Sequence, residues 1–390
     1  FMTLWLGWFM TGLNFSMTMP FMALYIETLH PYGKFELNLY AGLAFAVTYL
    51  AQAIVSPLWG NLADQKGRKL MCLRASGVMT FTIFAVGLVH HAWTIVLLRF
   101  VQGAFSGYIN NATAFMAGET PHNRSGAVMA NMMTANVTGN LLGPLVGGLL
   151  AGFAGYRVTF FVCGAMMGIV FLLTLFNTKE HFTPIPAKKM KPMKEIFAQL
   201  ENKQLIIAMF ITTLFIQSAL MSIAPIVSLL VKSLMHGTGN VSFVSGVVAA
   251  MPGFGTLLVA SRLGVKMDKI GPLKVLVFGL VAAMVVFLPM YFVTSPWSLG
   301  FWRFLLGIAN AALLPAVQTV LTVSVPREAF GRIFSYNQSF QAAGAMLGSM
   351  MGSLISGLFN YQAVFLVTAA LMALNLLLIW KVHRPLENEK

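Results

Sequence analysis

Residues 60–69 read Gly60-Asn-Leu-Ala-Asp64-Gln-Lys-Gly67-Arg68-Lys69, and they separate two apolar runs near 38–62 and 70–90. Each run has about 20 residues, enough for a helix to cross the ~30 Å hydrocarbon core of a membrane. A glycine followed by bases between two such runs favours a tight turn at a membrane face. The stretch therefore predicts two membrane-spanning helices joined by a short charged connection.

The composition extends this interpretation to the whole chain. Residues of the AVILMFWYC set make up 58% of the 390 residues and charged residues only 9%, against about 25% in soluble domains. The chain is predicted to be an all-α membrane protein. Cys72 and Cys163 are too few for a disulfide framework, and without a Cys/His cluster no metal is expected.

Apolar runs of this length recur in two sets of six, with a polar stretch between the sets. The expected spans lie near 3–28, 38–62, 70–90, 93–117, 125–151, 156–177, 204–232, 241–265, 272–293, 297–322, 329–357 and 361–382. The predicted organisation is a six-helix bundle at 1–177, a cytoplasmic linker at 178–203, a second bundle at 204–382 and a cytoplasmic tail at 383–390.

The distribution of Lys and Arg predicts the orientation of these spans. If residue 1 lies inside the cell, most bases fall in cytoplasmic connections, and only Lys34, Arg157 and Lys232 fall in outside ones. Cytoplasmic loops carry such an excess of bases, so both termini are expected in the cytoplasm. The net charge of +14 is thus interpreted as a topology signal, and binding to nucleic acid is not expected.

The two sets of spans repeat one another at a spacing of 204–205 residues. The repeated pairs are Pro20/Pro225, Asp64/Asp268, Gly67/Gly271, Arg99/Arg303, Gly103/Gly307, Gly139/Gly344, Gly143/Gly348, Gly147/Gly352 and Tyr156/Tyr361. Six spans separate the copies, so both have the same orientation in the membrane. Parallel repeats of this kind are typical of transporters that alternate access around a central site.

Two further stretches place residues inside expected spans that are energetically costly or unusual in a membrane. Arg99, in Arg99-Phe-Val-Gln102-Gly103, lies roughly 10 Å below the outer membrane boundary at ~1.5 Å rise per residue. An arginine at that depth indicates function, although its head could instead extend to the interface. In Gly139-Asn-Leu-Leu-Gly143-Pro144-Leu-Val-Gly147-Gly148, the glycines clear one helix face for close packing.

Taken together, these stretches resemble the signature motifs of the major facilitator superfamily, and the resemblance spans the whole chain. It implies a fold of 12 helices in two six-helix repeats, without a cofactor. The loop after span 2, its degenerate copy near Asp268 and the proline-containing motif would then form a conformational gate. The residues implied in it are Gly60, Asp64, Gly67, Arg68, Lys69, Gly143, Pro144, Gly147, Gly148 and Asp268.

Within the superfamily, the chain resembles the 12-span drug:proton antiporters of bacteria. The matching stretches include Met19-Pro20-Phe21-Met22-Ala23-Leu24-Tyr25-Ile26-Glu27 and Leu313-Leu314-Pro315-Ala316-Val317-Gln318. The resemblance implies a monomer in the bacterial inner membrane that exports lipophilic small molecules, with the proton as coupling ion. Facilitated transport or flipping of a lipid or metabolite stays open, as does a receptor or scaffold without transport. No enzyme fingerprint occurs.

Polar amides within the spans sketch a substrate cavity among Met and Phe residues. Flexible, Met-rich surfaces suit binding of varied ligands, although buried amides also bond neighbouring helices. The candidate substrate-binding residues are Asn14, Asn110, Asn111, Asn136, Gln217, Asn310, Gln318 and Asn337.

Proton coupling needs a titratable group on the transport path, and the span interiors hold no acid at midplane depth. Glu27, near the outer end of span 1, is the candidate carrier, although it could equally be a solvated end residue. Arg99 is expected nearby, where its charge would favour the ionised carboxylate. Glu119, near the inner end of span 4, is the next candidate.

Overall fold

The computed structural model describes residues 2–120, 125–180, 202–325 and 330–388, and all regular structure in these ranges is helical. Ten segments in them are long and apolar enough to cross a membrane. The expected spans near 3–28 and 329–357 are not among the ten. The first is interrupted by a 3-10 turn at Met19–Phe21, and the second carries Asn337 and several other polar side chains.

Contacts divide the chain into two units, and the division crosses the sequence-based halves at one segment. Unit 1 contains 1–187 together with Val227–Ala250, whereas unit 2 contains 188–226 and 251–390. The expected linker at 178–203 lies mostly outside the described residues. The expected tail continues the last helix as far as Asn388.

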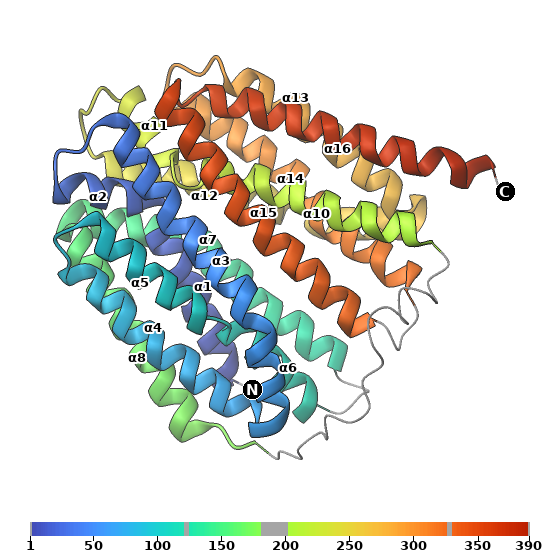
Figure 1. The fold of residues 1–390 in the computed structure, drawn as a ribbon, viewed down its shortest axis with the longest axis horizontal. Helices are drawn as coiled ribbons and strands as arrows, with labels where there is room; N and C mark the ends of the chain where they lie inside the picture. Colours follow the sequence, from blue (N-terminus) through green and yellow to red (C-terminus); the bar gives the residue numbers. More distant parts are fainter. Residues whose placement is uncertain (1, 121–124, 181–201, 326–329, 389–390) are drawn as a thin grey trace. The chain divides into compact units, whose positions relative to one another are not determined.

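Unit 1 is built from helices that pack in pairs, among them α1 with α7 and α4 with α8 (Figure 1). Its elements are α1 (Met2–Thr18), η1 (Met19–Phe21), α2 (Met22–Leu29), α3 (Lys34–Lys66), α4 (Arg68–Leu88), α5 (Ala92–Phe105), α6 (Tyr108–Glu119), α7 (Ser125–Ala154), α8 (Tyr156–Asn177), α11 (Val227–Leu234) and the start of α12 (Val241–Ile270).

Unit 2 repeats this pairing, with α10 against α15 and α13 against α16. Its elements are α10 (Lys203–Ile223), the remainder of α12, α13 (Pro272–Met290), α14 (Pro296–Ser324), α15 (Phe330–Leu358) and α16 (Ala363–Asn388).

Three expected spans are broken, and each break has a local cause. Pro20 lies in the 3-10 turn between α1 and α2, and Pro225 lies in the turn between α10 and α11. Proline removes a backbone donor and clashes with the preceding turn. Between α5 and α6, Gly107 adopts a left-handed φ of 114°. As a result, α2 and α11 are short helices of 8 residues each.

Repeated glycines let backbones meet at equivalent places in the two units. At each of them, a side-chain carbon would overlap a carbonyl oxygen of the neighbouring helix, and the 204–205-residue spacing holds for both partners. The equivalent contacts are Gly103 on Thr48 and Gly307 on Pro252, Gly139 on Phe9 and Gly344 on Leu214, Gly143 on Leu13 and Gly348 on Ser218, and Gly147 on Met17 and Gly352 on Ser222.

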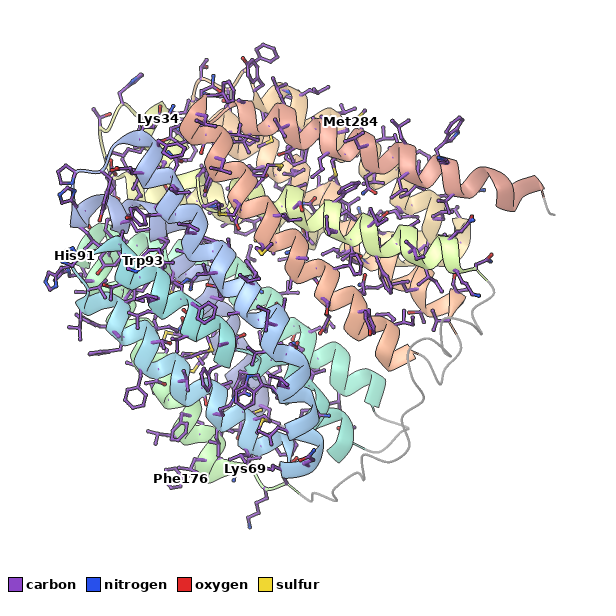
Figure 2. All side chains as sticks on the ribbon, viewed as in Figure 1. Lys34, Lys69, His91, Trp93, Phe176 and Met284 are labelled. Carbon is purple, nitrogen blue, oxygen red and sulfur yellow. The ribbon has the colours of Figure 1, made fainter. Side chains whose placement is uncertain are left out.

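Large apolar side chains point away from the helices. Trp93 is 56% exposed and Phe176 75% exposed, and Phe176 extends beyond the ribbon in Figure 2. Such exposure would be a liability in water, whereas lipid accepts it. The outward-facing apolar side chains therefore agree with a membrane setting for the ten apolar segments.

Candidate functional site

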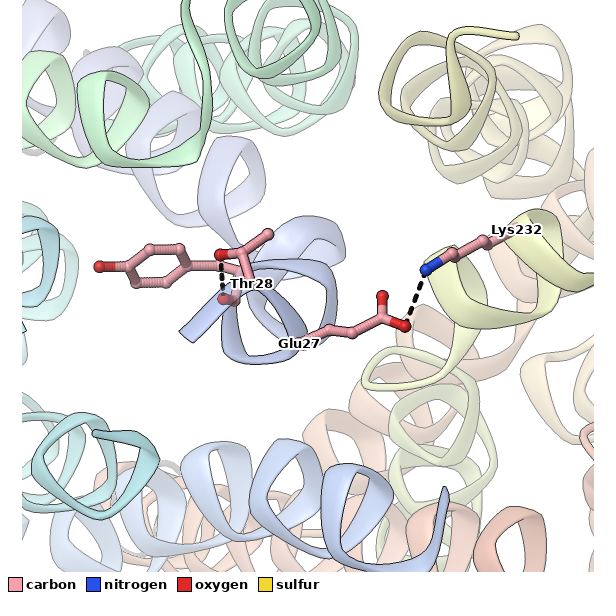
Figure 3. Close-up of polar contacts among 4 residues, drawn as sticks. Glu27, Thr28 and Lys232 are labelled. Carbon is pink, nitrogen blue, oxygen red and sulfur yellow. Dashed lines mark hydrogen bonds and ion pairs between the residues drawn. The ribbon is translucent and has the colours of Figure 1, made fainter. Parts of the chain in front are cut away.

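Glu27 and Lys232 form an ion pair in unit 1 (Figure 3). The Lys232 Nζ lies 2.7 Å from the Glu27 Oε1 and donates a hydrogen bond to it. Glu27 comes from α2 and Lys232 from α11. The cation that pairs with Glu27 therefore comes from α11, and the expectation that Arg99 lies nearby stays a prediction.

The positions of these two residues follow from the interrupted helices. Pro20 and Pro225 occur 205 residues apart, and each precedes one of the 8-residue helices. Glu27 and Lys232 are also 205 residues apart. They are therefore the same position in the two copies of the sequence repeat, with opposite charges.

The pair is partly exposed, which limits its energy. The side chain of Lys232 is 41% exposed and that of Glu27 is 34% exposed. Pairs with this exposure contribute about 0–1 kcal/mol, because water screens the attraction and the side chains lose freedom. Such a pair cannot hold the fold together, but about 1 kcal/mol changes a two-state equilibrium roughly fivefold.

Arg99 lies in a different setting, buried in α5 with 2% exposure. Its Nη1 donates to the Gln102 Oε1 at 3.0 Å, and its guanidinium lies 5.7 Å from the ring centre of Phe45. Its Nε and Nη2 have no hydrogen-bond partner among the described residues. Burial of a cation without full pairing is costly, so this arginine has capacity to bind an acceptor. Arg303, its counterpart in α14, is half-buried.

The charged turn that begins α4 is held by a residue that the sequence analysis missed. The carboxylate of Glu180 accepts hydrogen bonds from the backbone N–H groups of Arg68 and Lys69, at 2.7 and 2.8 Å. The Lys69 Nζ in turn donates to the carbonyls of Leu175 and Thr178, at 3.0 and 2.6 Å. An acid thus caps the start of α4 and a base caps the end of α8, as helix dipoles favour.

This reciprocal contact, which we call the α4–α8 clasp, consists of Arg68, Lys69, Leu175, Thr178 and Glu180. Lys69 and the backbone N–H of Arg68 are therefore engaged in hydrogen bonds within unit 1. The sequence signal for this contact was Glu180 itself, an acid just after the sixth apolar run and in a stretch dominated by lysines.

The structure describes only part of the remaining residues of the expected gate at this turn. Gly60 and Asp64 lie in α3 and Asp268 lies in α12, but the side chains of both acids fall outside the described part of the structure. Gly67 ends α3 with a φ of 95°, a conformation that glycine adopts without strain.

The proline-containing motif lies on a continuous helix with two packing faces. Gly143 and Gly147 meet the backbone of α1, whereas Gly148 meets Ser242 and Gly246 at the start of α12. The helix α7 runs unbroken through Pro144, and the Pro144 carbonyl lies against Gly246. The motif therefore packs α7 against both α1 and the start of α12.

Several of the candidate substrate-binding amides already form hydrogen bonds within the protein. Asn14 is buried and donates to the Cys163 carbonyl of α8, so its amide nitrogen bonds two helices. Asn111 donates to the Gly107 carbonyl at 2.8 Å, and Asn136 accepts from Asn140. All three bonds are local or between neighbouring helices of unit 1.

In unit 2, Asn337 accepts from the Thr213 Oγ1 at 2.7 Å. Gln217 is buried, and its Oε1 has no hydrogen-bond partner within the described ranges. Asn310 is half-buried in α14, whereas Gln318 of α14 and Asn110 of α6 are exposed. Among the candidate substrate-binding residues, Gln217 is thus the buried amide whose oxygen can accept a further hydrogen bond.

Comparison with known proteins identifies the family. A model of the Major Facilitator Superfamily matches residues 4–266 and 226–390. The chain belongs to this superfamily. It is accordingly a multi-pass inner-membrane transporter and not an enzyme.

Curated relatives match over almost the full length. The chain is 46% identical over 380 residues to the multidrug resistance protein MdtG of Citrobacter koseri, which covers 97% of this chain and 94% of the relative. It is 45% identical over 376 residues to MdtG of Salmonella arizonae, covering 96% and 93%.

Solved structures share the fold at low identity. The nucleoside transporter NupG superposes with a TM-score of 0.77 at 15% identity, covering 98% of each chain. A bacterial homologue of the human lysosomal transporter Spinster superposes with a TM-score of 0.78 at 18% identity, covering 98% and 96%. At these identities the likeness concerns the fold of the superfamily.

Proposed function

We propose that this chain exports lipophilic drugs or similar small amphipathic molecules by proton antiport with alternating access. The observation that carries the proposal is the identity of 45–46% to multidrug resistance proteins over nearly the whole chain. Binding of varied ligands is supported by 26 Met and 32 Phe residues, since flexible apolar surfaces repack around different shapes.

The proposed fold has 12 spans in two parallel six-helix repeats. The glycine contacts that recur at equivalent places in both units support the repeat. The excess of Lys and Arg on one side supports cytoplasmic termini. The active form is proposed to be a monomer, because parallel repeats within one chain already provide two halves that can alternate around a site.

Glu27 is the proposed proton carrier. A proton on this carboxylate removes the negative charge that attracts Lys232, so protonation and the ion pair exclude one another. Arg99 belongs to the same machinery, because a buried guanidinium with two unpartnered nitrogens needs an acceptor during some step of transport. The proton is the coupling ion and no cofactor is proposed.

The proposed substrate contacts are amides within the spans, with Gln217 at the centre of the proposal because its buried Oε1 is free. The amides of Asn14, Asn111, Asn136 and Asn337 are engaged in the structure, so a substrate would have to exchange with these bonds. Asn110, Asn310 and Gln318 complete the proposed set.

Reconstitution in proteoliposomes tests the function. A lipophilic dye is loaded outside or inside, a pH gradient is imposed, and dye and proton fluxes are followed together. We expect uphill dye movement with a stoichiometric proton flux in the opposite direction. Dye movement only down its own gradient would favour facilitated transport or lipid flipping. No movement of any dye or lipid would overturn the proposal and favour a receptor or scaffold.

A further inference from the structure

The two members of the ion pair are equivalent residues of an internal repeat. Glu27 is the sixth residue of α2 and Lys232 the sixth residue of α11, and both helices have 8 residues. Equivalent positions of the two sequence copies therefore touch each other within unit 1. Identical charged residues there would repel one another.

The opposite charges turn this meeting point into a specific contact. We propose that Glu27 and Lys232 form an ionic latch between α2 and α11 on the outer side of the membrane, with Lys232 as a positioning residue for the coupling carboxylate. The inference rests on the proposed transport function, and it adds the group against which Glu27 works. It assigns to Lys232 a role that no motif in the sequence indicates.

Neutral contacts pack the helices around the pair. The Tyr156 hydroxyl bonds the Ser242 Oγ at 2.9 Å, and Gly148 lies against the backbone of Ser242. Arg157 donates to the Val89 carbonyl at 3.2 Å. Neutral contacts therefore bring the start of α12 to α7 and α8.

Both side chains are more than a third exposed. The latch therefore biases an equilibrium and does not lock the protein. An exposed pair of this kind shifts a two-state equilibrium by up to about fivefold. A bias of this size suits a contact that must break and form again in every transport cycle.

The test measures the gap between the two helices directly. Cys72 and Cys163 are buried and free, so they are replaced by serine and spin labels are placed at two introduced cysteines. The sites are Thr28→Cys and Ser233→Cys, which are exposed neighbours of the pair. Distance distributions are recorded for full-length protein in lipid nanodiscs with Glu27→Gln, Lys232→Gln, and the exchange Glu27→Lys with Lys232→Glu.

We expect each single neutral variant to raise the long-distance population by up to about fivefold, and the charge exchange to restore the original distribution. Glu27→Lys alone should open the gap most, since it places two lysines together. The control Glu36→Gln removes an exposed acid from the first turn of α3 and should change nothing. Unchanged distributions in both neutral variants, or an exchange that behaves like Glu27→Lys, would overturn the latch.

The same proteins separate failure of the latch from failure of the proposed function. Wild-type protein without proton-driven dye movement contradicts antiport, whatever the distances show. Wild-type antiport with unaltered distances in Lys232→Gln contradicts the latch alone. Restored distances in the charge exchange support the latch even where uphill transport is lost.

Discussion

The glycine turn between α3 and α4 in unit 1 has the same backbone conformation as the turn between α12 and α13 in unit 2. The residues that follow the two turns differ in their chemistry. Gly67 has a φ of 95° and donates to the Ala63 carbonyl at 3.0 Å, and Gly271 has a φ of 90° and donates to the Met267 carbonyl at 3.0 Å. After Gly67, Glu180 caps the exposed N–H groups of α4. After Gly271 comes Pro272, which has no N–H to satisfy.

The comparison distinguishes what the fold needs from what is specific to one copy. Both units need a glycine turn and close helix contacts, and these features agree at a fixed spacing. The copies differ in the break between α5 and α6, in the residue after the glycine turn, and in the charges of Glu27 and Lys232. In a duplicated chain, agreement between copies marks packing, and disagreement marks candidates for function.

The largest effect is expected where the units agree. Gly147→Val and Gly352→Val would each push a side chain into a backbone carbonyl, of Met17 and Ser222 respectively. Overpacking against backbone costs about 3 kcal/mol or more, so both variants should unfold at markedly lower temperature in detergent. The control Gly33→Ala has open space around it and should match wild type. A stable variant in only one unit would break the structural equivalence of the two copies.

The next effect concerns a position at which the copies differ. Glu27→Gln removes the proposed proton carrier, so dye accumulation driven by a pH gradient should fall to the level of simple equilibration. Downhill exchange should persist, because the side chain keeps its size and the fold does not depend on an exposed pair. Dye flux in proteoliposomes with and without a gradient measures both. Uphill export by this variant would exclude Glu27 as carrier and direct attention to Glu119.

The positions of most helices along the chain could be predicted from the sequence, because apolar runs of about 20 residues are a strong signal of membrane-spanning helices. The interruptions near Pro20 and Pro225 were harder to predict, since proline is tolerated in many membrane helices. The partner of Glu27 was missed although the repeat contained the information: adding the 205-residue spacing to Glu27 gives Lys232. Arg99 was chosen as partner from depth alone, and depth does not fix which helices adjoin.

Glu180 could not be assigned from the sequence for a different reason. Its function depends on the end of α8 meeting the start of α4, which is a tertiary contact between segments 111–112 residues apart. A local pattern identifies the turn at Gly67, but it does not identify which acid caps the following helix.

Removal of the α4–α8 clasp should have a moderate effect confined to unit 1. Glu180→Gln leaves a neutral acceptor in place of a charged one at the N-terminus of α4, which should cost about 1–2 kcal/mol locally. Hydrogen exchange at the amides of Arg68 and Lys69 should then accelerate about tenfold, while the turn at Gly271 stays unchanged. Unaltered exchange at both amides would contradict a capping role for Glu180.

The smallest effect is expected for the acid before each glycine turn, and it tests whether the two turns also differ in function. Asp64→Asn should shift the equilibrium toward states open to the cytoplasm by an amount on the order of 1 kcal/mol, because an acid beside a helix start favours the closed arrangement. Asp268→Asn should shift it less, since the second copy lacks the three bases that follow Asp64 at Lys66, Arg68 and Lys69. Spin labels on the cytoplasmic ends of the helices measure both shifts, and turnover should slow in Asp64→Asn while thermal stability is retained. Equal shifts in the two variants would mean that the turns act as a symmetric pair, and the α4–α8 clasp would then concern stability alone.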